Sequence, residues 1–347
     1  MRFNTEGVSR RTVLRGAAAC ALASSPALRA AVKLIDGPAP LELITDSHFR
    51  TGVNMWCTDD APGSTPTRAG ILCPAHAVCT PAWDGGQWAS HFDIGKAAPE
   101  ALPSGAVRYF DGGKGLTFGP QNTPEADLIL ALNGRKEYND VAPTAPGGWP
   151  HLLVEQQFSK QPSLATFQAV PFHISYRLLW SVAHKGQHWN PAQHTAQFTF
   201  YVTLQNRNNK STGFGDYLWF GVPMYDARYK LPRKYAAEDV GNAEKRATNK
   251  FIFDAPGEVL TSTPAASGQW ITIEHDLLRL MSEALETAWS AGFLAESRNK
   301  QDFVLGGMNI GWEITGPIDA AMQIRDLSLQ VVCDGASPDN SFNPANG

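Results

Sequence analysis

Apolar and polar residues alternate strictly over residues 197–205, which predicts a strand with one packed face and one polar face that includes Tyr201. In residues 171–182, we expect Tyr176, Leu178 and Trp180 to share one face. Similar runs predict further strands at residues 41–45, 106–110, 116–118, 128–132, 152–158, 216–224, 251–253 and 270–273. Strands without a regular β-α alternation favour a sandwich or jelly roll.

Residues 302–332 read as a strand, a tight turn at Gly316-Pro317 and a second strand. The apolar parity flips between Ile324 and Leu327, which predicts a bulge near Arg325-Asp326. Glu313 lies inside the first of these strands, where acids are depleted. We therefore expect Glu313 to serve a polar site or to bind a structural partner such as an arginine.

One helix is predicted from Asp276 to about residue 293, because apolar residues recur there at spacings of three and four. Asp276 is the predicted N-cap and Gly292 the predicted end. Residues 51–104 are rich in Pro, Gly, Cys and Trp with little periodicity, so they predict a long, loop-rich segment. Residues 226–248 are charged and predict an exposed excursion.

The composition limits the class of protein. The chain has 347 residues, a net charge of −4 and 18% charged residues, so it shows no basic footprint for nucleic acid. Beyond the N-terminal leader, we expect a single β-sandwich domain over residues 31–347. No other stretch approaches the ~18 consecutive apolar residues of a membrane helix, so no membrane span is expected in the mature chain.

The N-terminus carries an export signal. Ser9–Arg15, with the pair Arg10-Arg11, resembles the twin-arginine export motif, and an apolar run from Gly16 to Ser25 follows. Ser25-Pro26-Ala27 is one cleavage site, and cutting near Ala30 or Ala31 is an alternative. We interpret residues 1–30 as a signal peptide and expect a periplasmic or secreted bacterial protein. The resemblance implies folding before export, which leaves a bound cofactor open.

Four cysteines remain after the leader is removed, and an even count in an oxidising compartment favours disulfides. Cys73 and Cys79 are close enough to staple a small loop, and Cys57 would then reach Cys333. The sequence does not determine this connectivity. A zinc site made of all four cysteines is the alternative, but the spacing lacks a CxxC pair.

Two carboxylates inside predicted strands, Glu155 and Glu313, are the candidate catalytic pair. Glycoside hydrolysis commonly uses two carboxyls about 5 to 9 Å apart across a sugar. Aromatic residues that would bind the sugar lie on the predicted strands or next to them: Trp149, Trp180, Trp219, Trp312 and Tyr201, together with His151. The structural alternative is that Glu155 and Glu313 pair with Arg177 or Arg325 and hold the sheet together.

Other chemistry has weaker support. His184, His188 and His194 lie within eleven residues, and the HxxxH pair His184/His188 would suit a metal on a helix face. The segment is a predicted loop rather than a helix, so we predict no metal site there. The serine-elbow, P-loop and dinucleotide motifs are absent. The acids in Asp59-Asp60 and Asp84-Gly85 leave calcium open as a ligand; no other cofactor is expected.

The C-terminal order of features resembles bacterial concanavalin A-like jelly-roll proteins. The matching segments are residues 269–273, the helix from Asp276, residues 309–316 with the letters NIGWEITG, and residues 324–332. The resemblance covers residues 150–333 and implies a polysaccharide or oligosaccharide ligand, because that group contains glycoside hydrolases, polysaccharide lyases and lectins. The ExDxxE signature of its laminarinase-like hydrolases is absent. We predict a glycoside hydrolase; the alternatives are a lectin-like carbohydrate-binding protein and an envelope structural or assembly protein.

Overall fold

The computed structural model describes residues 39–57, 66–75, 78–144, 148–240, 248–266 and 268–334. The chain divides into two compact units, Met1–Gly37 and Pro38–Gly347, and every described residue belongs to the second. The expected signal peptide at residues 1–30 and the acids Asp59 and Asp60 lie outside the described residues.

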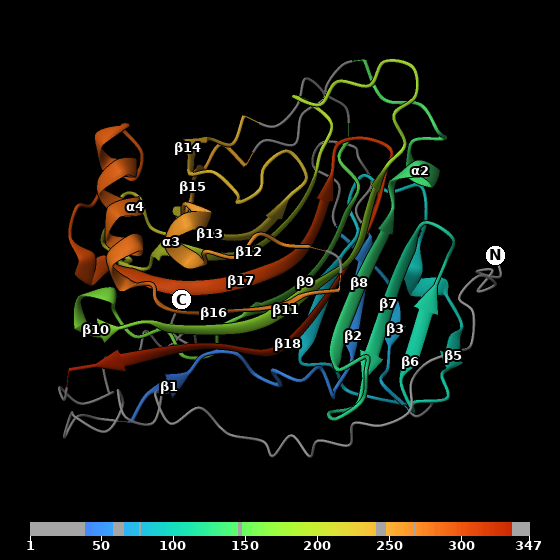
Figure 1. The fold of residues 1–347 in the computed structure, drawn as a ribbon. Helices are drawn as coiled ribbons and strands as arrows, with labels where there is room; N and C mark the ends of the chain where they lie inside the picture. Colours follow the sequence, from blue (N-terminus) through green and yellow to red (C-terminus); the bar gives the residue numbers. More distant parts are fainter. Residues whose placement is uncertain are drawn as a thin grey trace. The chain divides into compact units, whose positions relative to one another are not determined.

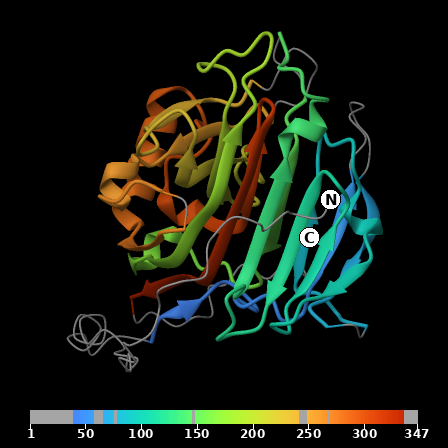
Figure 2. The ribbon, with the colours of Figure 1, turned by 45° about the vertical axis from the view of Figure 1, so that its right-hand side comes forward.

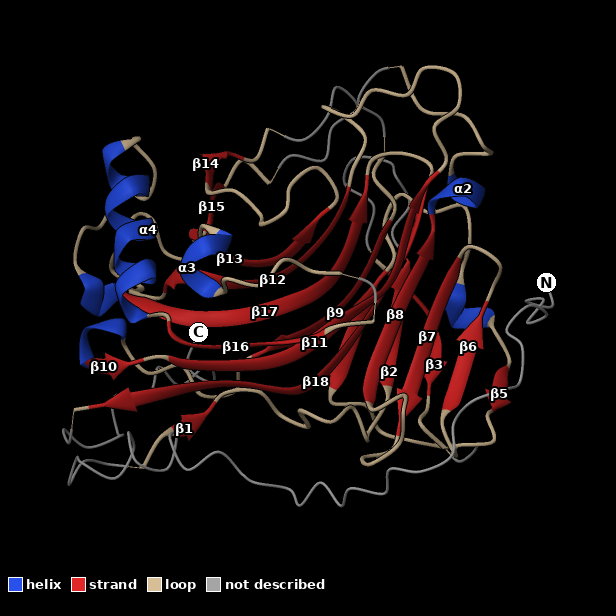
Figure 3. Ribbon diagram, in the orientation of Figure 1, coloured by secondary structure: helices blue, strands red, loops and turns tan. Residues whose placement is uncertain are grey.

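The second unit is built from two nine-stranded sheets (Figures 1 and 3). Sheet A consists, in spatial order, of β16 (Trp270–Asp276), β11 (Pro171–Ala183), β18 (Ile318–Cys333), β8 (Asp127–Asn133), β7 (Lys114–Gly119), β6 (Val107–Phe110) and β5 (Pro99–Ala101). Two short strands, β1 (Leu41–Glu42) and β10 (Phe167–Ala169), also pair with β18. Figure 2 shows β11, β18, β8 and β7 running side by side.

Sheet B consists, in spatial order, of β14 (Tyr235–Glu238), β15 (Phe251–Asp254), β13 (Tyr217–Asp226), β12 (Ala196–Asn206), β17 (Phe303–Ile314), β9 (His151–Gln157), β4 (Trp83–Gly86), β2 (Val53–Cys57) and β3 (Thr67–Leu72). The pairs β13–β15 and β2–β4 are parallel, and the other pairs are antiparallel.

The core lies between the two sheets. Phe172 on β11 contacts Phe200 on β12 with ring centroids 4.9 Å apart, and the Trp312 indole N–H on β17 donates to the Leu130 carbonyl on β8 at 2.9 Å. The prediction of an all-β sandwich is confirmed by the two packed sheets and the few helices. The alternation over residues 197–205 is confirmed too, because Phe198, Phe200 and their apolar partners are fully buried.

Helices are few. The predicted amphipathic helix is α4 (Leu278–Ser290), which packs beside β13 and β10. It begins two residues after Asp276, whose Oδ1 accepts the N–H groups of Leu278 at 3.1 Å and Val170 at 2.8 Å. The N-cap is Leu277 rather than the predicted Asp276. The remaining helical elements are short: α2 (Gly134–Glu137), α3 (Gly257–Leu260), η2 (Ile94–Lys96), η3 (Leu164–Thr166) and η4 (Lys300–Asp302).

One local prediction is refined by the structure and another is corrected. The segment 51–104, predicted to be loop-rich, also supplies four short strands: β2, β3 and β4 at the edge of sheet B and β5 in sheet A. Trp180 does not share a face with Leu178, because the register of β11 against β18 shifts between them. The shift turns the Trp180 ring outward, where it is 43% exposed.

The predicted bulge in β18 is confirmed. His173 pairs with Ser328 and Ser175 with Arg325, so β18 carries one extra residue there, and Asp326 adopts a positive φ of 56°. Among the described residues, no helix is both long and apolar enough to cross a membrane.

Candidate functional site

Sheet B has one apolar face against the core and one polar face. Register pairs that run across eight of its strands place one residue from each strand in a single row on the polar face, which we call the central row. The central row contains Asn54, Asp84, Glu155, Asn309, Tyr201, Gly221, Asp254 and Tyr235. Three of these eight residues are acids, although acids are depleted in strands.

Glu155 on β9 lies directly opposite Asp84 on β4. Burial raises the pKa of Glu155 to about 7, and the negative charge of Asp84 adds to the shift. Asp84 is fixed by the Trp56 indole, which donates to its Oδ1 at 2.9 Å. Glu155 can therefore hold a proton near neutral pH and donate it, as a general acid must.

Glu313 projects from the same face on the neighbouring strand, β17, but it does not lie opposite Glu155. Glu155 pairs with Asn309, four residues before Glu313, which is about 13 Å of strand. The side chain between them on β17 is missing, because that residue is Gly311. The expected 5 to 9 Å between the two carboxyls requires both side chains to lean over Gly311.

The surroundings of Glu313 are aromatic and polar. His151 is its cross-strand partner on β9, with Nε2 3.5 Å from the Glu313 carboxylate. The edge of Trp88 meets the His151 ring at 5.9 Å between centroids. On the other side, Gln197 of β12 is the partner of Glu313.

Asp254 is a fourth acid of the polar face, and the sequence analysis did not select it. It is only 8% exposed, and its Oδ1 has no hydrogen-bond partner. Burial raises its pKa to about 7; the hydrogen bond with Tyr201 opposes this shift, and the charges of Glu313 and Asp226 add to it. Its carboxylate occupies the space above Gly221, where a Cβ would lie 2.1 Å from Oδ1.

Aromatic side chains continue the polar face beyond Tyr201. Trp219 on β13 lies 6.1 Å from Tyr201 and 5.2 Å from Tyr217, ring centroid to ring centroid, both edge to face. Trp219 and Tyr217 are half-buried, so each leaves part of its ring open to a ligand. A flat, CH-rich sugar face packs on such rings.

A pocket of about 240 Å³ continues the polar face beyond Glu313. Its lining includes Thr315, two residues after Glu313 and just beyond the end of β17, and Gln197, the partner of Glu313. Trp149 and Arg228 form other parts of the wall. The Arg228 guanidinium is held by Asp226 at 2.6 Å, so its charge is already balanced.

The structure separates the predicted sugar-binding residues into two groups. Trp149, His151, Tyr201 and Trp219 come together on the polar face of sheet B or at its pocket. Trp312 is fully buried in the core, because it is on the opposite face of β17 from Glu313, and its selection as a sugar contact is wrong. Trp180 is exposed but lies on sheet A, away from the two candidate acids.

The predicted arginine partners are engaged elsewhere. Arg177 donates to Gln323 at 2.6 Å, and both Arg177 and Arg325 stack on the ring of Trp270, at 4.8 and 4.1 Å. Among the described residues, neither Glu155 nor Glu313 forms an ion pair with an arginine. The interpretation of these acids as arginine-paired struts is therefore not supported.

One of the two predicted disulfides is present. Cys73 and Cys79 form a disulfide, whereas Cys57 and Cys333 are free. Cys57 ends β2 in sheet B and accepts a hydrogen bond from Gln87, while Cys333 ends β18 in sheet A. Because both thiols are free, the predicted Cys57–Cys333 bond is wrong.

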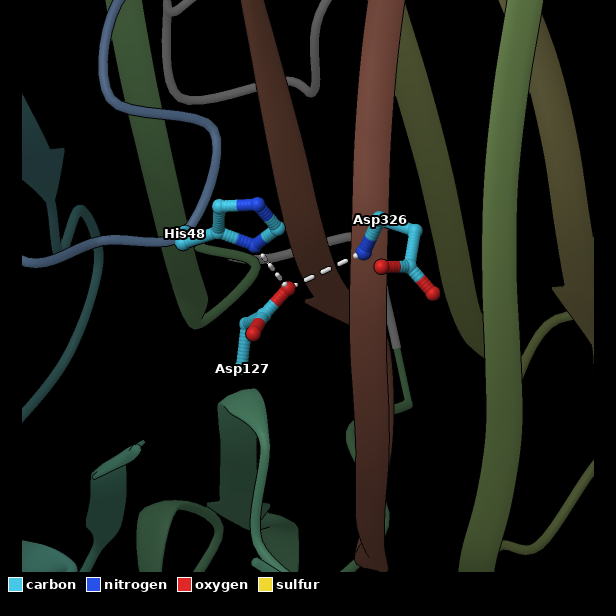
Figure 4. A group of neighbouring side chains, drawn as sticks. All are labelled: His48, Asp127 and Asp326. Atoms are coloured by element: carbon cyan, nitrogen blue, oxygen red, sulfur yellow. Dashed lines mark hydrogen bonds and ion pairs between the residues drawn. The ribbon is translucent and has the colours of Figure 1, made fainter. Parts of the chain in front are cut away.

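The described residues contain one group with metal-ligand geometry, His48, Asp127 and Asp326, whose ligand atoms lie within 4.8 Å of one another (Figure 4). Asp127 Oδ2 already contacts His48 Nδ1 at 2.8 Å and the Asp326 N–H at 3.0 Å. These bonds tie the β18 bulge to the start of β8, which explains the group structurally. Asp84, considered above for calcium, lies in β4 rather than in a loop.

The three loop histidines do not gather around a common point. His184 contacts Asp319 on sheet A at 2.9 Å. His194 is buried, with Nδ1 accepting the Asn190 N–H at 2.9 Å and Nε2 3.0 Å from the Pro143 carbonyl. His188 is exposed.

No protein-family model matches the chain, and no curated protein matches it in sequence. Similar solved structures include the endoglucanase cel12A from Rhodothermus marinus, which is 11% identical with a TM-score of 0.35 over 69% of this chain and 97% of its own. A family 12 xyloglucanase from Bacillus licheniformis is 11% identical with a TM-score of 0.37 over 68% and 97%.

A family 11 xylanase from Neocallimastix patriciarum is 8% identical with a TM-score of 0.34, over 68% of this chain and 95% of its own. Likeness at these identities and TM-scores decides nothing about the activity of this chain.

Proposed function

We propose that the protein is an exported glycoside hydrolase that acts on a polysaccharide or oligosaccharide at the polar face of sheet B. The observation that carries the proposal is the gathering of Asp84, Glu155, Glu313 and Asp254 on one face beside half-buried aromatic rings. A pair of carboxyl groups beside a sugar-binding surface is what hydrolysis of a glycosidic bond needs.

In this proposal Glu155 is the proton donor. The raised pKa of about 7 leaves a proton on its carboxyl at neutral and lower pH. As the glycosidic C–O bond breaks, that proton passes to the leaving oxygen. Glu313 is the second carboxylate, which either bonds to the anomeric carbon or removes a proton from the attacking water.

The aromatic residues and the pocket supply the binding surface. Trp219 and Tyr201 would support sugar rings on one side of Glu313, and the pocket with Trp149 in its wall would accept a ring on the other. His151 would orient the Glu313 carboxylate, which lies 3.5 Å away.

Export agrees with the Cys73–Cys79 disulfide, because disulfides persist in oxidising compartments such as the bacterial periplasm. The twin-arginine route remains a proposal that depends on the leader sequence. Fusion of residues 1–30 to a reporter that matures only after folded export would test it, with Arg10→Lys and Arg11→Lys as the inactive control.

The activity is tested by reducing-end release from a broad panel of polysaccharides by the mature protein. Glu155→Gln and Glu313→Gln should each remain folded and lose the activity, whereas Glu100→Gln, at the edge of sheet A, should keep it. If neither variant differs from the wild type on a glycan that is cut, the proposed pair is wrong.

A lectin-like function is the second candidate, because the register offset of Glu155 and Glu313 is larger than the separation of a catalytic pair. Binding of the panel glycans without any cleavage, with affinity lost in Trp219→Ala, would favour it over the hydrolase. A protein that neither binds nor cuts any glycan would contradict both.

A further inference from the structure

Asp254 is the least explained acid of the polar face. An ionised carboxylate that is 8% exposed needs hydrogen-bond donors or a cation. Among the described residues no cation pairs with it, and its Oδ1 has no partner. The Tyr201 hydroxyl on β12 acts on it as a hydrogen-bond donor that lowers the pKa of the carboxyl.

The backbone makes room for this carboxyl. Asp254 pairs in register with Gly221, which pairs with Tyr201. A Cβ on Gly221 would lie 2.1 Å from Asp254 Oδ1 and 2.7 Å from Tyr201 Cε1. The missing side chain is therefore what allows Asp254 to reach across β13 to the phenol of Tyr201.

Tyr201 stands between this buried acid and the candidate site. It pairs with Asn309, whose own Oδ1 is buried without a hydrogen-bond partner. Burial raises the pKa of Tyr201 well above its usual value, and the charges of Asp254 and Glu313 act in the same direction. The phenol thus stays protonated, with a single hydrogen to donate.

We propose that Asp254 is a positioning residue that determines which way the Tyr201 hydroxyl donates its hydrogen. When Asp254 carries a proton, it donates to the Tyr201 oxygen and leaves the phenol hydrogen free for a hydroxyl oxygen of the glycan beside Glu313. When Asp254 is ionised, it can only accept, and it takes the phenol hydrogen for itself. This inference rests on the proposed function for its ligand, but not for the Asp254–Tyr201 contact.

The direction of the pH effect follows from the groups that face Asp254. Glu313 of β17 and Asp226 of β13 are negative neighbours, Tyr201 of β12 is the hydrogen-bond partner, and Tyr235 of β14 is the register partner. Burial and the two negative charges keep a proton on Asp254 up to a pKa of about 7. Below about pH 7 the Tyr201 hydroxyl is therefore free to donate to a ligand, and above about pH 7 it donates to Asp254.

The test uses Asp254→Asn, whose amide always donates and so mimics the protonated acid. The ratio of kcat/KM in this variant to that of the wild type should rise about tenfold between about pH 5.5 and pH 8.5, the effect of one hydrogen bond. In a Tyr201→Phe background the ratio should stay constant. Asp319→Asn, on sheet A, is the matched control and should give a constant ratio.

Two outcomes would overturn the inference. A constant ratio with Tyr201 present means that Asp254 does not direct the phenol. A folded Asp254→Asn variant without activity at any pH means that Asp254 reacts with the substrate itself.

A second measurement does not need activity. The carboxyl carbon of Asp254, assigned in ¹³C-labelled protein by its loss in Asp254→Asn, should titrate near pH 7. Its pKa should rise in Tyr201→Phe, because the hydrogen bond that lowers it is removed. If the protein cuts no glycan but this titration holds, the proposed hydrolase is wrong and the Asp254–Tyr201 contact stands; an unchanged Asp254 pKa in Tyr201→Phe overturns the contact.

Discussion

Two acids of the central row, Glu155 and Asp254, have the same pKa of about 7 and different surroundings. Glu155 is partly exposed and lies directly opposite the acid Asp84 on the neighbouring strand, β4. Asp254 is almost fully covered, is hydrogen-bonded to Tyr201 and is influenced by Glu313. Burial is the main cause of both shifts, so the shift alone does not separate a proton donor from a positioning group.

Access and hydrogen bonding separate the two. A group that donates a proton to a substrate must reach it, and Glu155 has an exposed part from which to do so. Asp254 is 8% exposed with Oδ1 covered, and Tyr201 is the neighbour through which it can act on the polar face. Glu155 is therefore placed to transfer a proton, and Asp254 to orient the Tyr201 hydroxyl.

Catalytic rate should show the largest difference between the two acids. Glu155→Gln removes a proton donor and should lower kcat by about 10²–10⁴-fold, and Glu313→Gln should have a comparable effect. Asp254→Asn should cost less than about tenfold near pH 6, where the wild-type acid is protonated anyway. Initial rates on the glycan found in the panel measure all three. Equal losses in Glu155→Gln and Asp254→Asn would remove the distinction.

Stability should respond strongly to the space above Gly221. Gly221→Ala places a Cβ 2.1 Å from Asp254 Oδ1 and should lower the free energy of unfolding by about 1–3 kcal/mol. Gly115→Ala, in β7, meets its nearest neighbour at 3.5 Å and should change it by less than about 0.5 kcal/mol. Urea denaturation measures both.

The same clash gives an internal check. In a Gly221→Ala/Asp254→Ala double variant the carboxyl is gone, so part of the lost stability should return. Strictly additive losses would show that the Asp254 side chain is not the group that a Gly221 side chain displaces.

The dependence of stability on pH should reveal the buried proton of each acid. Because the folded pKa of Glu155, about 7, lies above its unfolded value of about 4.5, the folded state binds more protons between these pH values. This contribution is fully present below about pH 4.5 and is lost as the pH rises through about 7. Between pH 4.5 and 7.5 the unfolding free energy of Glu155→Gln should therefore fall by about 1–3 kcal/mol less than that of the wild type.

Asp254→Asn should flatten the same fall, since its folded pKa is raised in the same way. Unfolding free energies from urea curves at several pH values compare each variant with the wild type, which cancels the contributions of other groups. A variant curve parallel to that of the wild type would show that the acid concerned is ionised in the folded protein.

The smallest effects should be exchanges between neighbours. Asp84→Asn should lower the pKa of Glu155 by less than about one unit and leave the pKa of Asp254 unchanged. Glu313→Gln should lower the pKa of Asp254 by a similar amount and leave the pKa of Glu155 unchanged. Carboxyl ¹³C titrations resolve such shifts. If Glu313→Gln shifts the pKa of Glu155 instead, the two carboxyls lean toward each other over Gly311. Glu155 and Asp254 would then not have separate charged neighbours.

Local patterns in the sequence determined most of the strands. The alternation over residues 197–205, the bulge in β18 and the helix after Asp276 follow from near-neighbour spacing, and the structure contains all three. Glu155 and Glu313 could be found because an acid inside an apolar strand is conspicuous by itself. The Cys73–Cys79 bond needed only a short loop.

Contacts between distant segments were decided only by the tertiary structure. Asp254 ends a short strand and gives no local sign, and it reaches Tyr201 because sheet order places Gly221 between them. Trp312 and Glu313 are neighbours in sequence, yet one is in the core and the other on the polar face, because successive strand residues point to opposite sides. Alternation marks two faces, but which face meets the second sheet depends on strand order and register, which are properties of pairs of segments.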